Sequence, residues 1–64
     1  MKYIELTYWE FGENILINID HISHVLERDE DEYREIFLSN GVVIKVAETY
    51  WEILNEIQTT RSKQ

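Results

Sequence analysis

At residues 34–46 the chain reads REIFLSNGVVIKV, with an apolar run on each side of the pair Asn40-Gly41. Asn and Gly both tolerate the positive φ angles of a type I′ turn, and the twist of this turn matches that of paired strands. The stretch therefore predicts a β-hairpin with strands at 33–39 and 42–46 and a two-residue loop between them.

A two-residue loop fixes which residues share a face of this hairpin. Opposed residues lie on the same face, so Leu38 would face Val43 and Phe37 would face Ile44. The period of two residues then places Ile36, Leu38 and Val43 on one face. The other face would carry Tyr33, Phe37, Val42, Ile44 and Val46. Because both faces would be apolar, we expect cover on both sides, from a barrel-like curl, a helix or a second subunit.

A helix is predicted at residues 49–59. Thr49 and Glu52 have the spacing of a capping box, in which each side chain satisfies a free backbone donor of the first turn. An apolar stripe at i, i+3, i+4 and i+7 follows, with Trp51 on its flank, and we expect this stripe to pack on the sheet. The stripe consists of Tyr50, Ile53, Leu54 and Ile57. Residues 60–64 are expected to form a frayed tail.

The first half of the chain predicts three more strands, at residues 2–9, 15–19 and 22–27, from alternating and β-branched residues. Asp20-His21 favours a tight bend between the second and third strands, because Asp bonds its own backbone in turns. The sequence thus predicts a single α+β domain over residues 1–64. We expect a small antiparallel sheet of about five strands, open to curling into a barrel, and a C-terminal helix.

Length and charge exclude several classes of function. The chain has 64 residues, no cysteine, and a net charge of −7 from 13 acidic and 6 basic side chains. Such a charge repels phosphate and anionic lipid, so we expect neither nucleic-acid binding nor membrane insertion. Charge interrupts the apolar residues near Met1, which predicts a cytoplasmic protein without a signal peptide.

No candidate catalytic or metal site emerges. The run at 27–32 holds five carboxylates but lacks the ligand spacing of a calcium loop, so we interpret it as a solvated loop. His21 and His24 would point to opposite sides in a bend and a strand. No phosphate-binding loop, dinucleotide fingerprint or nucleophile elbow is present. We expect no enzyme activity, no cofactor and no metal.

The aromatic and aliphatic residues that remain suggest a protein interface. Trp and Tyr are frequent anchors in interfaces, and apolar residues on both sheet faces exceed what a small domain can hide. We expect a homodimer, because symmetric dimers are the commonest way to cover such a patch. The candidate interface residues are Trp9, Phe11, Ile36, Leu38, Val43 and Trp51.

Across nearly its whole length the chain resembles the FlbD/SwrD family of small flagellar and swarming-motility proteins. The resemblance is carried by residues 4–7 (IELT), 17–22 (INIDHI), 36–41 (IFLSNG) and 46–48 (VAE), leading into Glu52-Ile53. A Pro-Asp-Thr element associated with that family is absent and is replaced by the acidic residues 29–32. The resemblance implies an accessory role near the flagellar motor through protein contacts, without catalytic residues.

The sequence therefore favours a small non-enzymatic protein-interaction module, with another protein as its partner and a role in bacterial motility as one setting. Two alternatives stay open. One is an acidic, phage-type inhibitor that imitates DNA, and the other is a structural subunit of a homo-oligomer.

Overall fold

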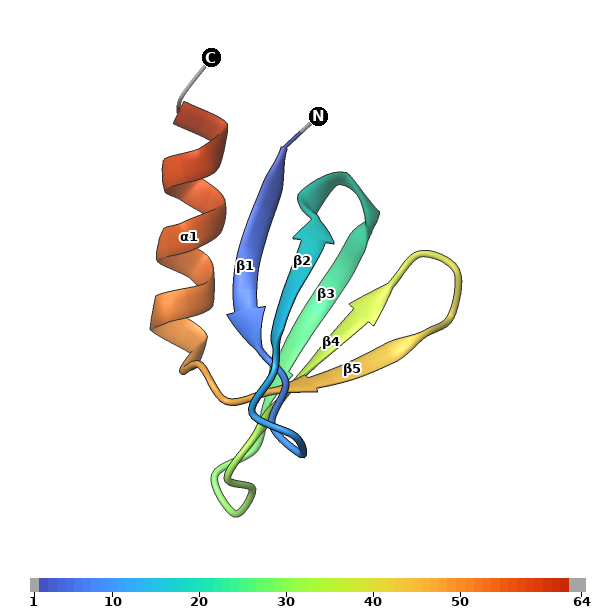
Figure 1. The fold of residues 1–64 in the computed structure, drawn as a ribbon, viewed down its shortest axis with the longest axis vertical. Coiled ribbons are helices and arrows are strands. Elements are labelled where there is room, and N and C mark those ends of the chain that lie inside the picture. Colours follow the sequence, from blue (N-terminus) through green and yellow to red (C-terminus); the bar gives the residue numbers. More distant parts are fainter. Residues whose placement is uncertain (1, 63–64) are drawn as a thin grey trace.

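The computed structural model describes residues 2–62 and confirms the α+β class. Within this range five strands form two antiparallel sheets, and one helix follows the last strand (Figure 1). The strands are β1 (Tyr3–Thr7), β2 (Asn14–Asn18), β3 (Ile22–Glu27), β4 (Arg34–Leu38) and β5 (Val43–Val46). A 3₁₀ turn, η1 (Ile19–His21), joins β2 to β3, and the helix is α1 (Tyr50–Ser62).

The prediction of one five-stranded sheet was wrong in its connectivity. β1 pairs with β2 in one sheet, β3, β4 and β5 form a second, and the sheets do not close into a barrel. The break lies at η1, where the Asn18 side chain accepts a hydrogen bond from the Asp20 backbone N–H at 3.0 Å and turns the chain. An isolated bridge between Tyr8 and Val46 connects the end of β1 to β5.

The turn between β4 and β5 differs from the predicted type I′ turn. The Leu38 N–H donates to the Val42 carbonyl at 2.9 Å, so the loop consists of three residues, 39–41. Gly41 has a φ of 91°, while no residue other than glycine among those described has a positive φ, which excludes a type I′ turn at Asn40-Gly41. The Asn40 side chain instead accepts from the Val42 N–H at 3.0 Å.

That extra loop residue shifts the register by one and reassigns the faces. Ile36 pairs with Ile44, and Phe37 pairs with Val43. Because a slip of one residue exchanges the two faces of a strand, the apolar residues Ile36, Ile44 and Val46 gather on one face. The predicted grouping of Ile36 and Leu38 with Val43 was therefore wrong, since Val43 lies on the opposite face.

The core lies between the two sheets and the helix. Both sheets and α1 contribute aliphatic side chains, and among the described residues no polar or charged one is buried. The buried residues are Ile4, Leu6, Ile17, Ile19, Ile36, Val46 and Ile53. Of the predicted helical stripe, Ile53 is buried and Ile57 packs against this core, whereas Tyr50 is exposed; α1 contacts β1 and β3.

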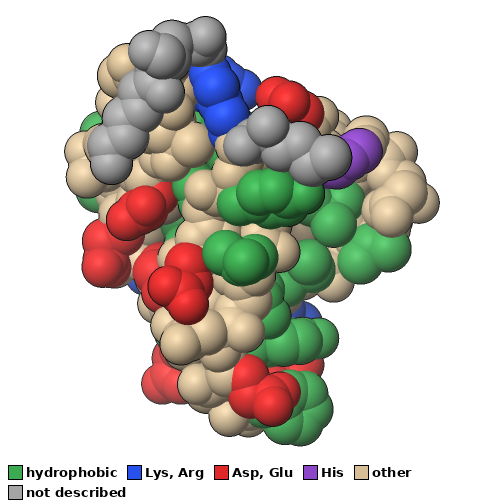
Figure 2. Space-filling model, turned by 45° about the horizontal axis from the view of Figure 1, so that its top comes forward, with side chains coloured by type: hydrophobic (Ala, Val, Ile, Leu, Met, Phe, Trp, Pro, Cys, Tyr) green, Lys and Arg blue, Asp and Glu red, His purple; other side chains and the backbone are tan. Residues whose placement is uncertain are grey.

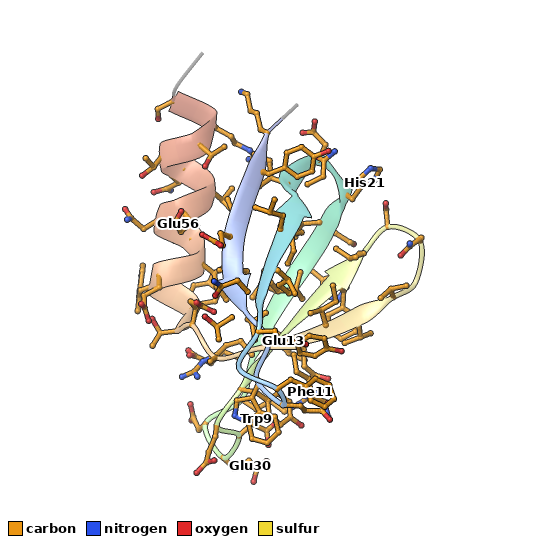
Figure 3. All side chains as sticks on the ribbon, viewed as in Figure 1. Trp9, Phe11, Glu13, His21, Glu30 and Glu56 are labelled. Carbon is orange, nitrogen blue, oxygen red and sulfur yellow. The ribbon has the colours of Figure 1, made fainter. Side chains whose placement is uncertain are left out.

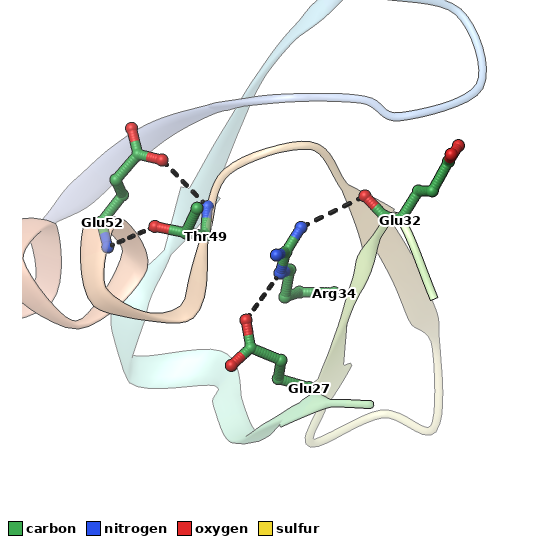
Figure 4. Close-up of polar contacts among 5 residues, drawn as sticks. All are labelled: Glu27, Glu32, Arg34, Thr49 and Glu52. Carbon is green, nitrogen blue, oxygen red and sulfur yellow. Dashed lines mark hydrogen bonds and ion pairs between the residues drawn. The ribbon is translucent and has the colours of Figure 1, made fainter. Parts of the chain in front are cut away.

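Polar contacts fix the start of α1. The Glu52 carboxylate accepts from the Thr49 N–H at 3.0 Å, and the Thr49 hydroxyl accepts from the Glu52 N–H at 3.2 Å, which confirms the capping box (Figure 4). Glu48, just before the cap, accepts from the Thr7 N–H and hydroxyl at 2.8 and 2.9 Å. These bonds tie the helix entrance to the end of β1.

The helix ends later than predicted. It continues to Ser62, so residues 60–62 belong to it, and residues 63–64 of the predicted tail lie outside the described part of the chain. Neither Gly nor Pro interrupts residues 50–62, and Arg61 in the last turn suits the negative end of the helix dipole. The Ser62 hydroxyl also donates to the Gln58 carbonyl at 2.8 Å.

Candidate protein-binding surface

Aromatic side chains gather at the end of the molecule where β1 leads toward β2 and β3 leads toward β4. Figure 3 shows Trp9, Phe11 and Glu30 at the lower end of the molecule. The Trp9 and Tyr33 rings contact each other with centroids 5.0 Å apart, and the Tyr8 and Phe11 rings meet edge to face at 5.4 Å. We call the surface formed by Tyr8, Trp9, Phe11 and Tyr33 the aromatic end.

The backbone holds these rings in a defined loop. The Tyr8 N–H donates to the Glu13 carbonyl at 2.7 Å, and the Gly12 N–H donates to the Tyr8 carbonyl at 2.8 Å. Gly12 has a φ of 70°, which a residue with a Cβ adopts only under strain. The Trp9 N–H also donates to the Lys45 carbonyl at 3.0 Å, so Trp9 is anchored to β5. Backbone hydrogen bonds thus hold this loop, which also contains the contact between the Tyr8 and Phe11 rings.

Phe11 is the most exposed ring of this surface. Its side chain is 67% exposed, and that of Trp9 is 39% exposed. Figure 2 shows hydrophobic side chains lying directly beside acidic ones at the lower end of the molecule. A bulky apolar group surrounded by charge is typical of an interface anchor.

Ion pairs stiffen the second loop of the aromatic end, between β3 and β4. The Arg28 guanidinium bonds to Glu35 and lies 3.7 Å from Asp31. The Glu35 hydrogen bond raises the pKa of Arg28 above its ordinary value. Arg34 donates to the Glu27 carboxylate at 2.9 Å and to the Glu32 carbonyl at 3.1 Å (Figure 4). Arg28 and Arg34 thereby neutralise part of the acidic run.

Other carboxylates of the two loops have no such partner. Within residues 2–62, no cationic group forms an ion pair with the following carboxylates at this end: Glu10, Glu13, Asp29, Glu30 and Glu32. The Lys45 Nζ lies 4.8 Å from the centroid of the Tyr33 ring, at cation–π distance. The aromatic end therefore combines exposed rings with uncompensated negative charge.

The predicted interface residues Trp9 and Trp51 lie in different elements and contact different rings. Trp51 lies in the first turn of α1, where it meets Tyr50 edge to face at 5.7 Å, and it is 72% exposed. Trp9 contacts Tyr33. The structure thus separates the predicted aromatic residues into two groups and brings only Trp9 and Phe11 to the same loop.

The three predicted aliphatic interface residues occupy different environments. Ile36 is completely buried, Leu38 is half-buried against the core, and Val43 is 43% exposed on the other face of the sheet. The dimer was predicted from two apolar sheet faces, whereas in the observed register Ile36, Ile44 and Val46 share one face. Self-association stays a prediction, but the two apolar sheet faces no longer support it.

Two hollows open on the surface away from the aromatic end. One, of about 370 Å³, lies between α1 and β3 and has Ile22, Val25 and Leu54 among its lining residues. The other, of about 430 Å³, lies between β2 and the β4–β5 turn, with Leu16 and Asn40 in its wall. Both have mostly apolar walls and hold no charged pair.

The histidines do not come together as a ligand pair. His21 ends η1, whereas His24 stacks on Phe37 with centroids 4.3 Å apart and forms a hydrogen bond between Nδ1 and the Ser23 hydroxyl at 3.1 Å. Among residues 2–62, no group of three His, Asp or Glu side chains has a geometry that could hold a metal ion. No helix in this range is long and apolar enough to cross a membrane.

Sequence reasoning missed Tyr8, Tyr33 and Lys45 as members of the aromatic end. Tyr33 was assigned to a strand face and Lys45 was given no role, since only the bridge from β1 to β5 brings them beside Trp9. Comparison of the chain with protein-family models, with curated proteins and with solved structures found no match.

Proposed function

We propose that this protein is a small non-enzymatic protein-interaction module whose binding surface is the aromatic end. The observation that carries the proposal is the loop with Trp9 and Phe11, in which backbone bonds fix the turn while the rings stay exposed. Rigid aromatic side chains lose little conformational entropy when a partner covers them, which makes them effective anchors.

Affinity capture from a lysate of the source organism, followed by mass spectrometry, tests the proposal. Phe11→Ser removes the most exposed ring of the surface, and Trp51→Ser is the matched control, since it removes an equally exposed ring on α1. We expect the wild type and the Trp51 variant to enrich the same partner, and the Phe11 variant to lose it. Equal enrichment by all three forms would contradict the proposal.

The resemblance to flagellar and swarming-motility proteins suggests one setting for such a module. We include in the proposal an accessory role in motility, exerted through contacts of the aromatic end with a larger protein. Deletion of the gene should then reduce swarming, and restoration should require Phe11. Rescue by the Phe11→Ser form would place any motility role outside this surface.

A further inference from the structure

We infer that the partner segment bound at the aromatic end is cationic: an extended, Lys- or Arg-rich stretch of another protein. The inference rests on the proposed function and adds the chemistry of the partner. Its basis is the combination of exposed rings with carboxylates that form no ion pair within residues 2–62.

The rings supply the apolar part of the contact. Phe11 presents most of its surface to solvent, and Trp9 is packed on Tyr33 so that its orientation is fixed. An Arg or Lys side chain lays its methylene stem along such rings and directs its charge at their faces. The Lys45 Nζ already lies over the Tyr33 ring, 4.8 Å from its centroid. The surface is thus suited to cationic side chains.

The carboxylates determine the sign of the charge that the partner must carry. Glu10 and Glu13 flank Phe11 in the first loop, and Asp29, Glu30 and Glu32 lie in the second, while the arginines of that loop are engaged with other acids. Figure 3 shows Glu30 at the end of the molecule that carries Trp9 and Phe11. A cationic segment would gain several charge contacts at once and would be steered to this end.

Net charge decides against other occupants. A second copy of this chain would bring another −7, and acidic peptides or phosphates would meet the same repulsion. A neutral apolar segment would satisfy the rings and leave the carboxylates without a cation. A cationic segment is the occupant that fits both parts of the surface.

Titration of synthetic peptides against the whole chain, followed through Trp9 fluorescence, tests the inference. Trp51→Phe provides a background in which Trp9 is the one tryptophan, because the sequence has two. The probe is a twelve-residue peptide of alternating Arg and Ser, compared with a peptide that has Gln in place of Arg. We expect saturable quenching by the Arg peptide alone, weakened when the ionic strength rises from about 0.05 to 0.5 M.

Two triple variants with the same net charge separate a local contact from general attraction. The site variant is Glu10→Gln, Glu13→Gln, Glu30→Gln, and the control is Glu5→Gln, Asp20→Asn, Glu56→Gln, whose acids lie on β1, η1 and α1. The site variant should bind the Arg peptide about tenfold more weakly, as the sum of three exposed charge contacts. The control should change affinity less than about twofold, since long-range effects are screened in salt.

Other results would contradict the cationic partner, or both this partner and the proposed function. Equal weakening in both triple variants, or equal binding of the Gln peptide, would overturn the inference. If the Arg peptide fails to bind while lysate capture still depends on Phe11, the cationic partner is wrong and the proposed function stands. If capture is independent of Phe11 as well, both are wrong.

Discussion

The two ends of the molecule contain the same kind of structural element, tight turns, but build them from different residues. At the end formed by η1 and the β4–β5 turn, asparagine side chains stabilise the turns. Asn18 accepts a hydrogen bond from the Asp20 N–H, and Asn40 accepts one from the Val42 N–H. At the aromatic end the backbone closes its own turns, yet the first loop also carries Trp9 and Phe11.

This difference indicates which residues folding requires and which it does not. A turn needs satisfied backbone groups and, where φ is positive, a glycine, and both ends meet these needs with Gly41 and Gly12. Nothing in turn formation requires a phenylalanine that is two-thirds exposed. We therefore propose that the exposed rings serve binding, and not the stability of the fold. Mutations can separate the residues that folding requires from those proposed for binding, beginning with the core that both ends share.

The largest effect is expected at Ile36, which is completely buried between the sheets. Ile36→Ala should lower the free energy of unfolding by about 2 to 5 kcal/mol, because it removes buried methylene groups and leaves a cavity. Urea denaturation monitored by circular dichroism gives the value. Val43→Ala, on the opposite face and partly exposed, is the matched control and should cost about 1 kcal/mol or less. Equal losses of stability in the two variants would indicate a two-residue loop, because Ile36 and Val43 share a face in that register.

The two glycines offer one matched change at each end. Gly12→Val and Gly41→Val should each lower the free energy of unfolding by about 1 to 3 kcal/mol, since a β-branched residue resists positive φ. A Cβ at either position would meet no atom within 4 Å, so the cost would arise from the backbone alone. Thermal denaturation of both variants checks this. A cost at Gly41 without one at Gly12 would show that the aromatic end is not held in the conformation described.

The helix cap should contribute less. Thr49→Ala removes the hydroxyl that accepts from the Glu52 N–H and should lower the free energy of unfolding by about 0.5 to 2 kcal/mol. Chemical denaturation measures the loss, and Thr59→Ala in the body of α1 is the control, with little or no loss expected. A Thr49 variant as stable as the wild type would mean that the cap does not hold α1. Partner capture should survive the change, because the cap lies outside the aromatic end.

The same cap makes a pH-dependent contribution. The hydrogen bond from the Thr49 backbone N–H lowers the pKa of Glu52 below its ordinary value. A carboxyl with a lowered folded-state pKa stabilises the fold above its unfolded pKa of about 4.3 and loses this contribution as the pH falls through the folded pKa. The wild type should therefore exceed Glu52→Gln in stability at neutral pH, and the difference should shrink in acid. A difference that is constant with pH would contradict the assignment.

Local signals in the sequence predicted local structure well, and long-range pairing less well. The cap at Thr49, the bend at Asp20-His21 and the strand at 22–27 depend on neighbours within a few residues, and each is found. The pair Asn40-Gly41 is compatible with a two-residue loop and with a three-residue loop. The sequence alone does not decide between these two loop lengths. The predicted loop was one residue too short, and this error exchanged the two faces of β5. Predictions about surfaces therefore depend strongly on strand register.

The aromatic end was predictable only in part, for a similar reason. Trp9 and Phe11 were among the predicted interface residues because aromatic side chains are frequent anchors in protein interfaces. Tyr33 and Lys45 could not be assigned to the same surface, since their proximity to Trp9 depends on the bridge between Tyr8 and Val46, which spans 38 residues of chain. Pairing at such separation leaves no local pattern in the sequence.

The smallest effect on stability should come from Phe11, and this makes it the sharpest test of the comparison between the two ends. Phe11→Ser removes an exposed ring from a loop whose hydrogen bonds are made by backbone atoms, so the free energy of unfolding should change by no more than about 0.5 kcal/mol. Denaturation and partner capture are measured on the same preparation, with Val42→Ser at the opposite end as the control for loss of an exposed apolar side chain. Binding should be lost in the first variant and kept in the second. If Phe11→Ser instead destabilises the domain by as much as a glycine variant, the ring is part of the fold, and its exposure cannot be attributed to binding.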